Sequence, residues 1–215
     1  MATTTTFETL VTDLQSYLER GLPTDPIVSA QIPRLINLAE RKIATELKVQ
    51  GFLRVVVVNL VAGQSVYDKP DSWRLTASMN IGTGSGFKKR TPVFGRGYEY
   101  LRAYWPDESA QGTPEIYADY DYDHWVFAPT PDAAYPLEVA YYAQLPLLDE
   151  TNQSNWLTEI APQLLLYGAL LEAGPFLKDD ERIATWQGLY DRAASALTGQ
   201  DVSKILDRAA VRKEA

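Results

Sequence analysis

The sequence predicts an α+β fold, with helices near both ends of the chain and a β-rich region between them. Apolar residues recur with the 3.6-residue spacing of amphipathic helices before residue 50 and after residue 155. Runs of β-branched and aromatic residues, separated by turn residues, fill the middle. With 46% hydrophobic and 22% charged residues, the 215-residue chain has the composition of a globular protein that buries a core.

The N-terminal part predicts two helices that pack as an antiparallel pair. The first covers residues 7–18, and Thr5 with Glu8 forms a capping-box pattern at its start. The second is expected over residues 32–48, which places Pro33 in the first turn, where its missing N–H is least harmful. These helices form one side of an expected helical bundle.

The middle of the chain predicts a β-rich insert. The β-branched run from Leu53 to Val61 is too short for a core helix and is bounded by Gly63. Further strands are expected at residues 65–67, 74–81, 87–94, 115–119, 125–128 and 137–142. Residues 98–104 fit either a short helix or an irregular loop, and periodicity does not decide between them.

Helical spacing returns near the C-terminus. Residues 156–173 predict a buried helix that Gly174 and Pro175 end, and residues 179–198 predict a long helix that ends before Gly199. An amphipathic arm follows, with apolar residues at i, i+3, i+4 and i+7: Val202, Ile205, Leu206 and Ala209. The expected parts are 1–51 for the N-terminal helices, 52–150 for the β insert, 151–200 for the C-terminal helices and 201–215 for the arm.

Composition excludes several classes of protein. The chain has no cysteine, so a disulfide framework and a thiolate metal site are both impossible. Its formal net charge of −8 repels phosphate backbones and disfavours a dedicated nucleic-acid binder. No secretion leader precedes the first helix and no apolar run approaches the ~18 residues of a membrane span. We expect no membrane association.

The single histidine, His124, lies in a segment of alternating acids and aromatics. The more frequent structure for such a pattern is a solvated strand face or turn that favours Asp, rather than a metal or acid–base site. A glycosidase needs two acids that flank the scissile bond, and one cluster offers them: Glu115, Asp119, Asp121 and Asp123. Nothing in the sequence marks either acid of such a pair as buried, so we expect no enzyme and no cofactor.

The one concentrated basic segment follows the glycine-rich residues 82–86. Its spacing does not match a phosphate-binding loop, and no helix pattern follows, so a flexible hairpin tip is the better interpretation. Lys88, Lys89 and Arg90 could contact an acidic partner or passing DNA.

Several segments, taken in order along the chain, resemble one known family. They are LINLAERKI at 35–43, VAGQSVYDKPD at 61–71, GTPEIY at 112–117, FAPTP at 127–131, YY at 141–142, NWL at 155–157 and PQLLLYGALLEA at 162–173. Their combination, which spans about the whole chain, is similar to the head-to-tail adaptor (connector) proteins of tailed bacteriophages. Each piece is a packing or turn pattern and none is a catalytic signature.

The resemblance implies a helical bundle interrupted by a β-rich domain, made in the host cytoplasm and located at the virion neck. It implies a dodecameric ring beneath the portal protein, which extends the DNA channel and docks the tail nozzle or other tail proteins. DNA would be passing cargo only. The arm at 201–215 matches the family's C-terminal arm, which reaches the portal.

Two other functions are weighed beside this one. Related connectors can carry cell-wall-cleaving activity, so a muramidase-like enzyme that uses acids of the β region is an alternative. A carbohydrate- or protein-binding module is a third, because 13 Tyr and 5 Trp supply aromatic contact surface.

Overall fold

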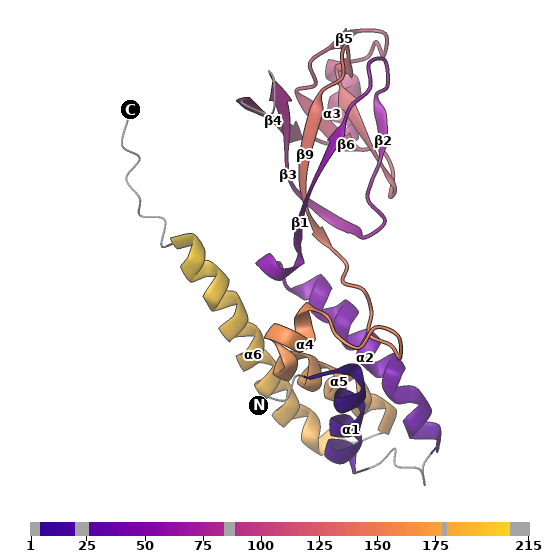
Figure 1. Ribbon diagram of the computed structural model, residues 1–215, viewed down its shortest axis with the longest axis vertical. Helices are drawn as coiled ribbons and strands as arrows, with labels where there is room; N and C mark the ends of the chain where they lie inside the picture. The colour runs from indigo at the N-terminus through magenta and orange to yellow at the C-terminus, as the bar shows by residue number, and fades with distance from the viewer. Residues whose placement is uncertain (1–4, 20–25, 84–88, 178–179, 207–215) are drawn as a thin grey trace. The chain divides into compact units, whose positions relative to one another are not determined.

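The computed structural model describes residues 5–19, 26–83, 89–177 and 180–206. The chain divides into two compact units. The described residues before Leu53 and after Ala143 form a helical unit, and Leu53–Ala143 form a β unit. Figure 1 shows the helices and strands gathered in these two groups.

The helical unit is organised around one central helix. Its elements are α1 (Phe7–Leu18), α2 (Pro26–Glu46), the 3-10 helix η1 (Gln50–Phe52), α4 (Trp156–Ile160), α5 (Pro162–Leu177) and α6 (Asp180–Leu206). Helix α5 packs against α1, α2, α4 and α6 (Figure 1). It carries apolar residues on nearly every side, because neighbours surround it: Leu164, Leu165, Ala169 and Leu170 are all buried.

The first two helices differ from prediction at their starts. Helix α1 covers the predicted residues 7–18, but its capping box is made by Thr6 and Thr9, not by Thr5 and Glu8. Helix α2 begins at Pro26, so the placement of Pro33 in its first turn was wrong. Val28 and Ile32, which precede Pro33, are both buried. Their packing stabilises the helix on both sides of Pro33, although proline cannot donate a backbone hydrogen bond there.

Two predicted helix ends were also wrong. Helix α5 continues through Gly174 and Pro175 to Leu177, and α6 continues through Gly199 to Leu206. A glycine inside a helix costs only about 1 kcal/mol relative to alanine, so Gly199 alone does not end α6.

The β unit contains a seven-stranded mixed sheet in the order β1-β9-β3-β4-β6-β7-β2. The strands are β1 (Leu53–Asn59), β2 (Val66–Asp68), β3 (Trp73–Thr83), β4 (Lys89–Gly95), β6 (Ile116–Asp119), β7 (His124–Ala128) and β9 (Pro136–Ala143). Neighbours run antiparallel except β4 and β6. A small parallel pair joins β5 (Gln111–Gly112) to β8 (Thr130–Pro131), which were too short to predict.

The large sheet curls around its own core. Residues of β9 alternate between partly exposed and buried, as a half-buried strand should. Leu137 and Val139 of β9 belong to the same buried cluster as Trp125 and Phe127 of β7, although three strands lie between β9 and β7 in the sheet order. The sheet's two halves therefore face each other across shared apolar side chains.

The segment left open by the sequence is a helix, α3 (Tyr98–Tyr104). Its buried residue, Leu101, packs in a second small cluster with Ala118, Val126 and Ala128. Among the helices that the structure describes, none has the length and apolar composition that crossing a bilayer requires.

Candidate functional site

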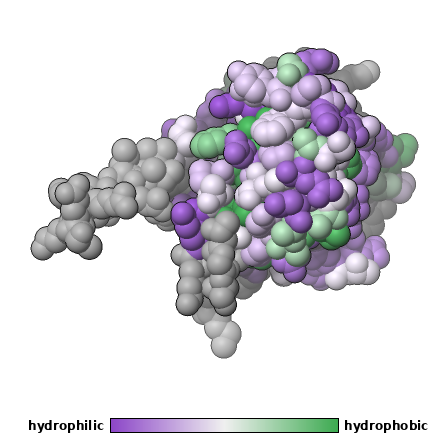
Figure 2. Space-filling model, turned by 90° about the horizontal axis from the view of Figure 1, so that it is seen from above, coloured by the Kyte–Doolittle hydropathy of each residue, from purple (hydrophilic) through white to green (hydrophobic). Residues whose placement is uncertain are grey.

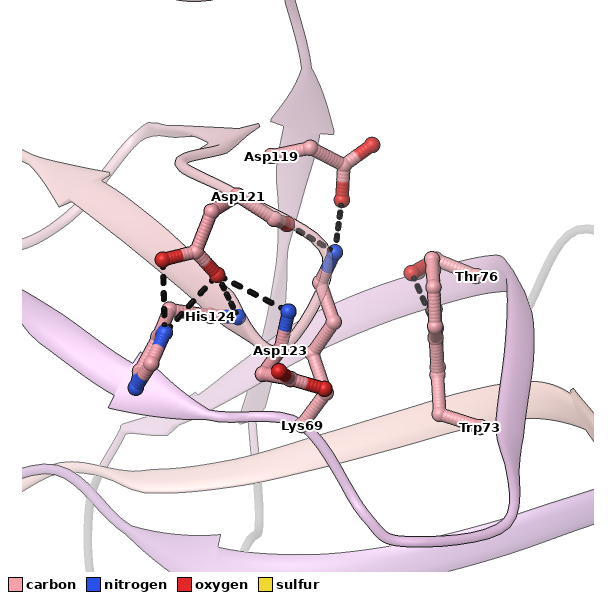
Figure 3. A network of polar contacts seen from close by, with 7 residues as sticks. All are labelled: Lys69, Trp73, Thr76, Asp119, Asp121, Asp123 and His124. Carbon is pink, nitrogen blue, oxygen red and sulfur yellow. Dashed lines mark hydrogen bonds and ion pairs between the residues drawn. The ribbon is translucent and has the colours of Figure 1, made fainter.

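The most developed polar network lies in the β unit, where the loop after β2 meets the turn between β6 and β7 (Figure 3). At its centre is Lys69, whose side chain is only 3% exposed. The Lys69 ammonium lies 2.8 Å from Asp119 Oδ1 and donates to the backbone oxygen of Asp121 at 2.9 Å. It also lies 3.9 Å from the centre of the Trp73 ring, a cation–π contact. Each contact compensates for removing a charge from water.

The turn itself is built by Asp121. One oxygen of its carboxylate accepts from the backbone N–H groups of Asp123 and His124, both at 2.8 Å (Figure 3). The His124 ring nitrogen Nδ1 lies 2.7 Å from the same oxygen, and its Nε2 lies 3.2 Å from Asp68 Oδ1. The aspartates of this segment thus form a turn, as its composition indicated.

These contacts set the protonation of the turn. The hydrogen bond to Asp121 raises the pKa of His124 above its usual range, and the same bond lowers the pKa of Asp121. A glycosidase's general acid needs the opposite, a carboxyl whose pKa is raised so that it keeps its proton. Asp121 therefore does not suit that role.

The network borders a hollow of about 240 Å³. Its lining residues are Asp68, Lys69, Pro70, Asp71, Trp73, Tyr122, Asp123 and His124. Of the four acids considered for a glycosidase pair, Asp123 alone lines this hollow. Asp119 pairs with Lys69, Asp121 caps the turn, and Glu115 precedes β6. Within the described part of the chain, no group of three or more His, Asp or Glu side chains is arranged to hold a metal ion.

The predicted basic segment is only partly described. Lys88 lies outside the described residues, and Lys89 is exposed at the start of β4. Arg90 forms an ion pair with Glu138 of β9 at 3.1 Å. Its charge is thus already partly compensated within the sheet.

The predicted arm residues lie at or beyond the end of α6. Val202, Ile205 and Leu206 belong to its last turns, and Ala209 lies outside the described residues. The described part of the predicted arm, up to Leu206, therefore continues α6 instead of starting a separate helix.

A second polar centre, which sequence reasoning missed, holds the helical unit together. Glu40 of α2 is 1% exposed, and burial raises its pKa. One carboxylate oxygen accepts from the backbone N–H of Leu148 at 3.1 Å, and the other accepts from Asn155 Nδ2 at 2.6 Å. Asn155 also caps α4 through its side-chain oxygen. The charged residue on an apolar helix face was the available signal, since such residues are buried only with partners.

The family model described as SU10 adaptor protein matches residues 5–212, nearly the full length. The chain belongs to the SU10 adaptor protein family. A comparison with curated proteins gave no match.

The match confirms the resemblance to phage head-to-tail adaptors. Membership identifies the adaptor as a phage structural protein and a virion component that interacts with other structural proteins of the phage. The match includes both units, with Glu40, Asn155 and the Lys69 network inside it.

Proposed function

We propose that this adaptor assembles as a dodecameric ring under the portal, extends the DNA channel and provides the surface on which the tail docks. The observation that carries the proposal is the family match across both units, from residue 5 to residue 212. A ring of identical subunits needs two different contact surfaces on each copy, related by a rotation that closes. The helices of the two chain ends would form its antiparallel bundle.

The end of α6 is the proposed portal contact. Val202, Ile205, Leu206 and Ala209 repeat at i, i+3, i+4 and i+7 at the end of a 27-residue helix. An amphipathic helix of this kind binds by placing its apolar stripe in a groove of a partner. Docking on the portal would bury that stripe.

The proposed role is structural, without catalysis. The polar networks on Lys69 and Glu40 are explained by what they hold in place: a turn between two strands, and a connecting segment against α2. The net charge of −8 suits a channel that DNA passes without adhering, since like charges repel.

Reconstitution with phage heads tests the function. DNA-filled heads that lack this protein are incubated with the purified chain and then with tails, and attached tails and retained DNA are measured. We expect attachment and retention to depend on the added protein. Heads that accept tails equally well without it would overturn the proposal.

The same preparation addresses cell-wall cleavage. Purified peptidoglycan is incubated with the chain and with a variant in which Asp119 and Asp123 are both changed to Asn. We expect no loss of turbidity with either protein, whereas a loss that the substitutions abolish would support the muramidase-like alternative.

A further inference from the structure

Exposed apolar side chains gather on the outward face of the sheet near its β1 edge, whereas Asn80, Glu138 and Arg90 make the rest of that face polar. Val55 and Val57 point away from the core and are each 58% exposed. Their register places Val55 opposite Ala140 and Val57 opposite Glu138 of β9. Tyr142, the next outward residue of β9 after Ala140, lies between Leu53 of β1 and the exposed Leu75 of β3 on the same face. Figure 2 shows hydrophobic areas among hydrophilic ones on one face of the molecule. We call Val55, Val57 and Leu75 the valine face.

The edge beside this face lacks the features that protect strand edges. β1 is one of the two edge strands of the sheet, pairs with β9 along all seven residues without a bulge, and carries a single charge, Arg54, at its start, with none from Val55 to Tyr67. β4 also has an exposed stretch, because β6 pairs only with Phe94 and Gly95, but that stretch carries Lys89, Arg90 and Pro92. Charges and proline are the usual protection of an edge. The contrast indicates that β1 and its outward face are covered by a partner.

The distribution of charge over the β unit favours a second copy of this chain as that partner. Residues 53–65, 72–98 and 136–143, which build the valine face, its strands and their loops, contain six basic residues and one acid. Residues 66–71 and 99–135, which build the β6–β7–β2 half and its loops, contain ten acids and two basic residues. The two halves of the sheet therefore carry opposite charge, so the acidic half of one copy complements the basic half of another.

The acidic half also offers an apolar anchor. Tyr122, at the tip of the turn between β6 and β7, is 78% exposed and lies between Asp121 and Asp123. Its ring meets the edge of Trp73 at 6.3 Å between centroids, and Asp121 fixes the turn that carries it. An exposed, pre-oriented tyrosine is typical of residues that contribute most to an interface.

We propose that the turn Tyr120–Asp123 of one copy docks on the valine face of the next copy. Tyr122 covers Val55 and Val57, while the aspartates beside it meet the basic strands. Two different surfaces are joined, so the contact is heterologous and repeats around a ring. The inference rests on the proposed ring and names the surfaces that join its subunits.

Site-specific crosslinking tests this contact, because the chain contains no cysteine of its own. Val57→Cys and Tyr122→Cys are made as single variants, mixed at high concentration and treated with a short bismaleimide. We expect the mixture to form crosslinked dimers several-fold faster than either variant alone, and the double variant to form a ladder of oligomers. High salt should slow the coupling, since complementary charges bring the copies together.

Tyr104→Cys supplies the matched control, because Tyr104 is an exposed tyrosine on α3, outside both proposed surfaces. Coupling of Val57→Cys to Tyr122→Cys that is no faster than to Tyr104→Cys would overturn the contact, as would coupling of Val57→Cys only to itself. Rings that form with the portal but lack the crosslink would refute this contact alone. Crosslinks without rings under any condition would support the contact and defeat the proposed ring.

Discussion

At the scale of single residues, the part of the chain that the structure describes buries two charged residues, Glu40 and Lys69, and supplies partners for each. Lys69 has a carboxylate, a carbonyl and an aromatic ring, and Glu40 has one backbone and one side-chain donor. Removing a partner leaves a buried polar group unsatisfied, which costs more than the bond contributes when it is made. These residues are therefore the sensitive points of the two units.

His124 should titrate above the ordinary histidine value of 6.5, because the Asp121 carboxylate stabilises its charged form. It is the only histidine in the chain, so NMR of the imidazole protons reports its pKa without ambiguity. Asp121→Asn should lower that pKa, and Asp132→Asn, on another turn, should leave it unchanged. A His124 pKa that does not respond to Asp121→Asn would contradict the described turn.

Replacing Glu40 by Ala should lower the free energy of unfolding by about 1–3 kcal/mol, since the Leu148 N–H loses its buried acceptor. Urea denaturation of the full chain measures the change. Glu150→Ala, an exposed acid in the same connecting segment, should stay within about 0.5 kcal/mol of the wild type. Equal effects of the two substitutions would show that Glu40 does not hold the segment.

The contribution of Glu40 to the stability of the fold should depend on pH in a definite direction. Burial raises its pKa in the folded state, so the folded protein binds this proton more tightly than the unfolded protein does. The resulting stability is complete below the unfolded carboxyl's pKa of about 4.5 and is lost as pH rises through the folded value. Glu40→Gln has no such proton, so the stability of the wild type relative to this variant should fall across that interval in urea titrations.

At the scale of elements, close packing decides where helices and strands begin and end. Gly51 of η1 lies against the Trp156 ring, which would occupy the position of an added Cβ. Trp156 also packs edge-on against Phe52, with centroids 5.4 Å apart. Gly188, inside α6, has no such neighbour within 4 Å.

The same substitution at these two glycines should have opposite effects. Gly51→Ala should destabilise the chain by about 1–3 kcal/mol, because the Trp156 ring must move. Gly188→Ala should stabilise it by about 0.5–1 kcal/mol, because alanine favours the helix. Thermal unfolding of both variants measures the signs, and a rise in Tm with Gly51→Ala would contradict the packing of Trp156.

Sequence reasoning predicted the α+β class, α1 and most strands, because each has a strong local pattern. It misplaced the starts or ends of α2, α5 and α6 because buried neighbours, not local stop signals, determine them there. Local periodicity does not specify the order of strands in a sheet. The curl of the sheet and the contact between Lys69 and Asp121, 52 residues apart, therefore could not be predicted. The exposed acids suggested a possible glycosidase pair. In the structure, Asp119 pairs with Lys69 and Asp121 accepts the backbone hydrogen bonds of the turn.

At the scale of the whole molecule, each unit has a separate proposed task. We propose that the helical unit supplies the portal contact at the end of α6, and that the β unit supplies the two oppositely charged surfaces that join copies. The net charge of −8 keeps free copies apart unless complementary regions meet, so assembly is favoured where a partner gathers them.

Deleting residues 201–215 should weaken attachment to the portal and leave the unfolding temperature nearly unchanged, because we propose that the apolar stripe contributes to portal binding and not to the folded core. Co-sedimentation with portal complexes measures attachment, and calorimetry measures Tm. A variant with Val202 and Leu206 changed to Ser should weaken attachment as the deletion does. Undiminished portal binding by both would contradict the assignment of the arm.

Electron microscopy of the purified chain, alone and mixed with its portal, is the sharpest test of the proposed ring. We expect dodecameric rings, at least where the portal is present, with the valine face of each copy covered by the next. Particles that stay monomeric in both samples, on portals known to accept tails, would contradict it.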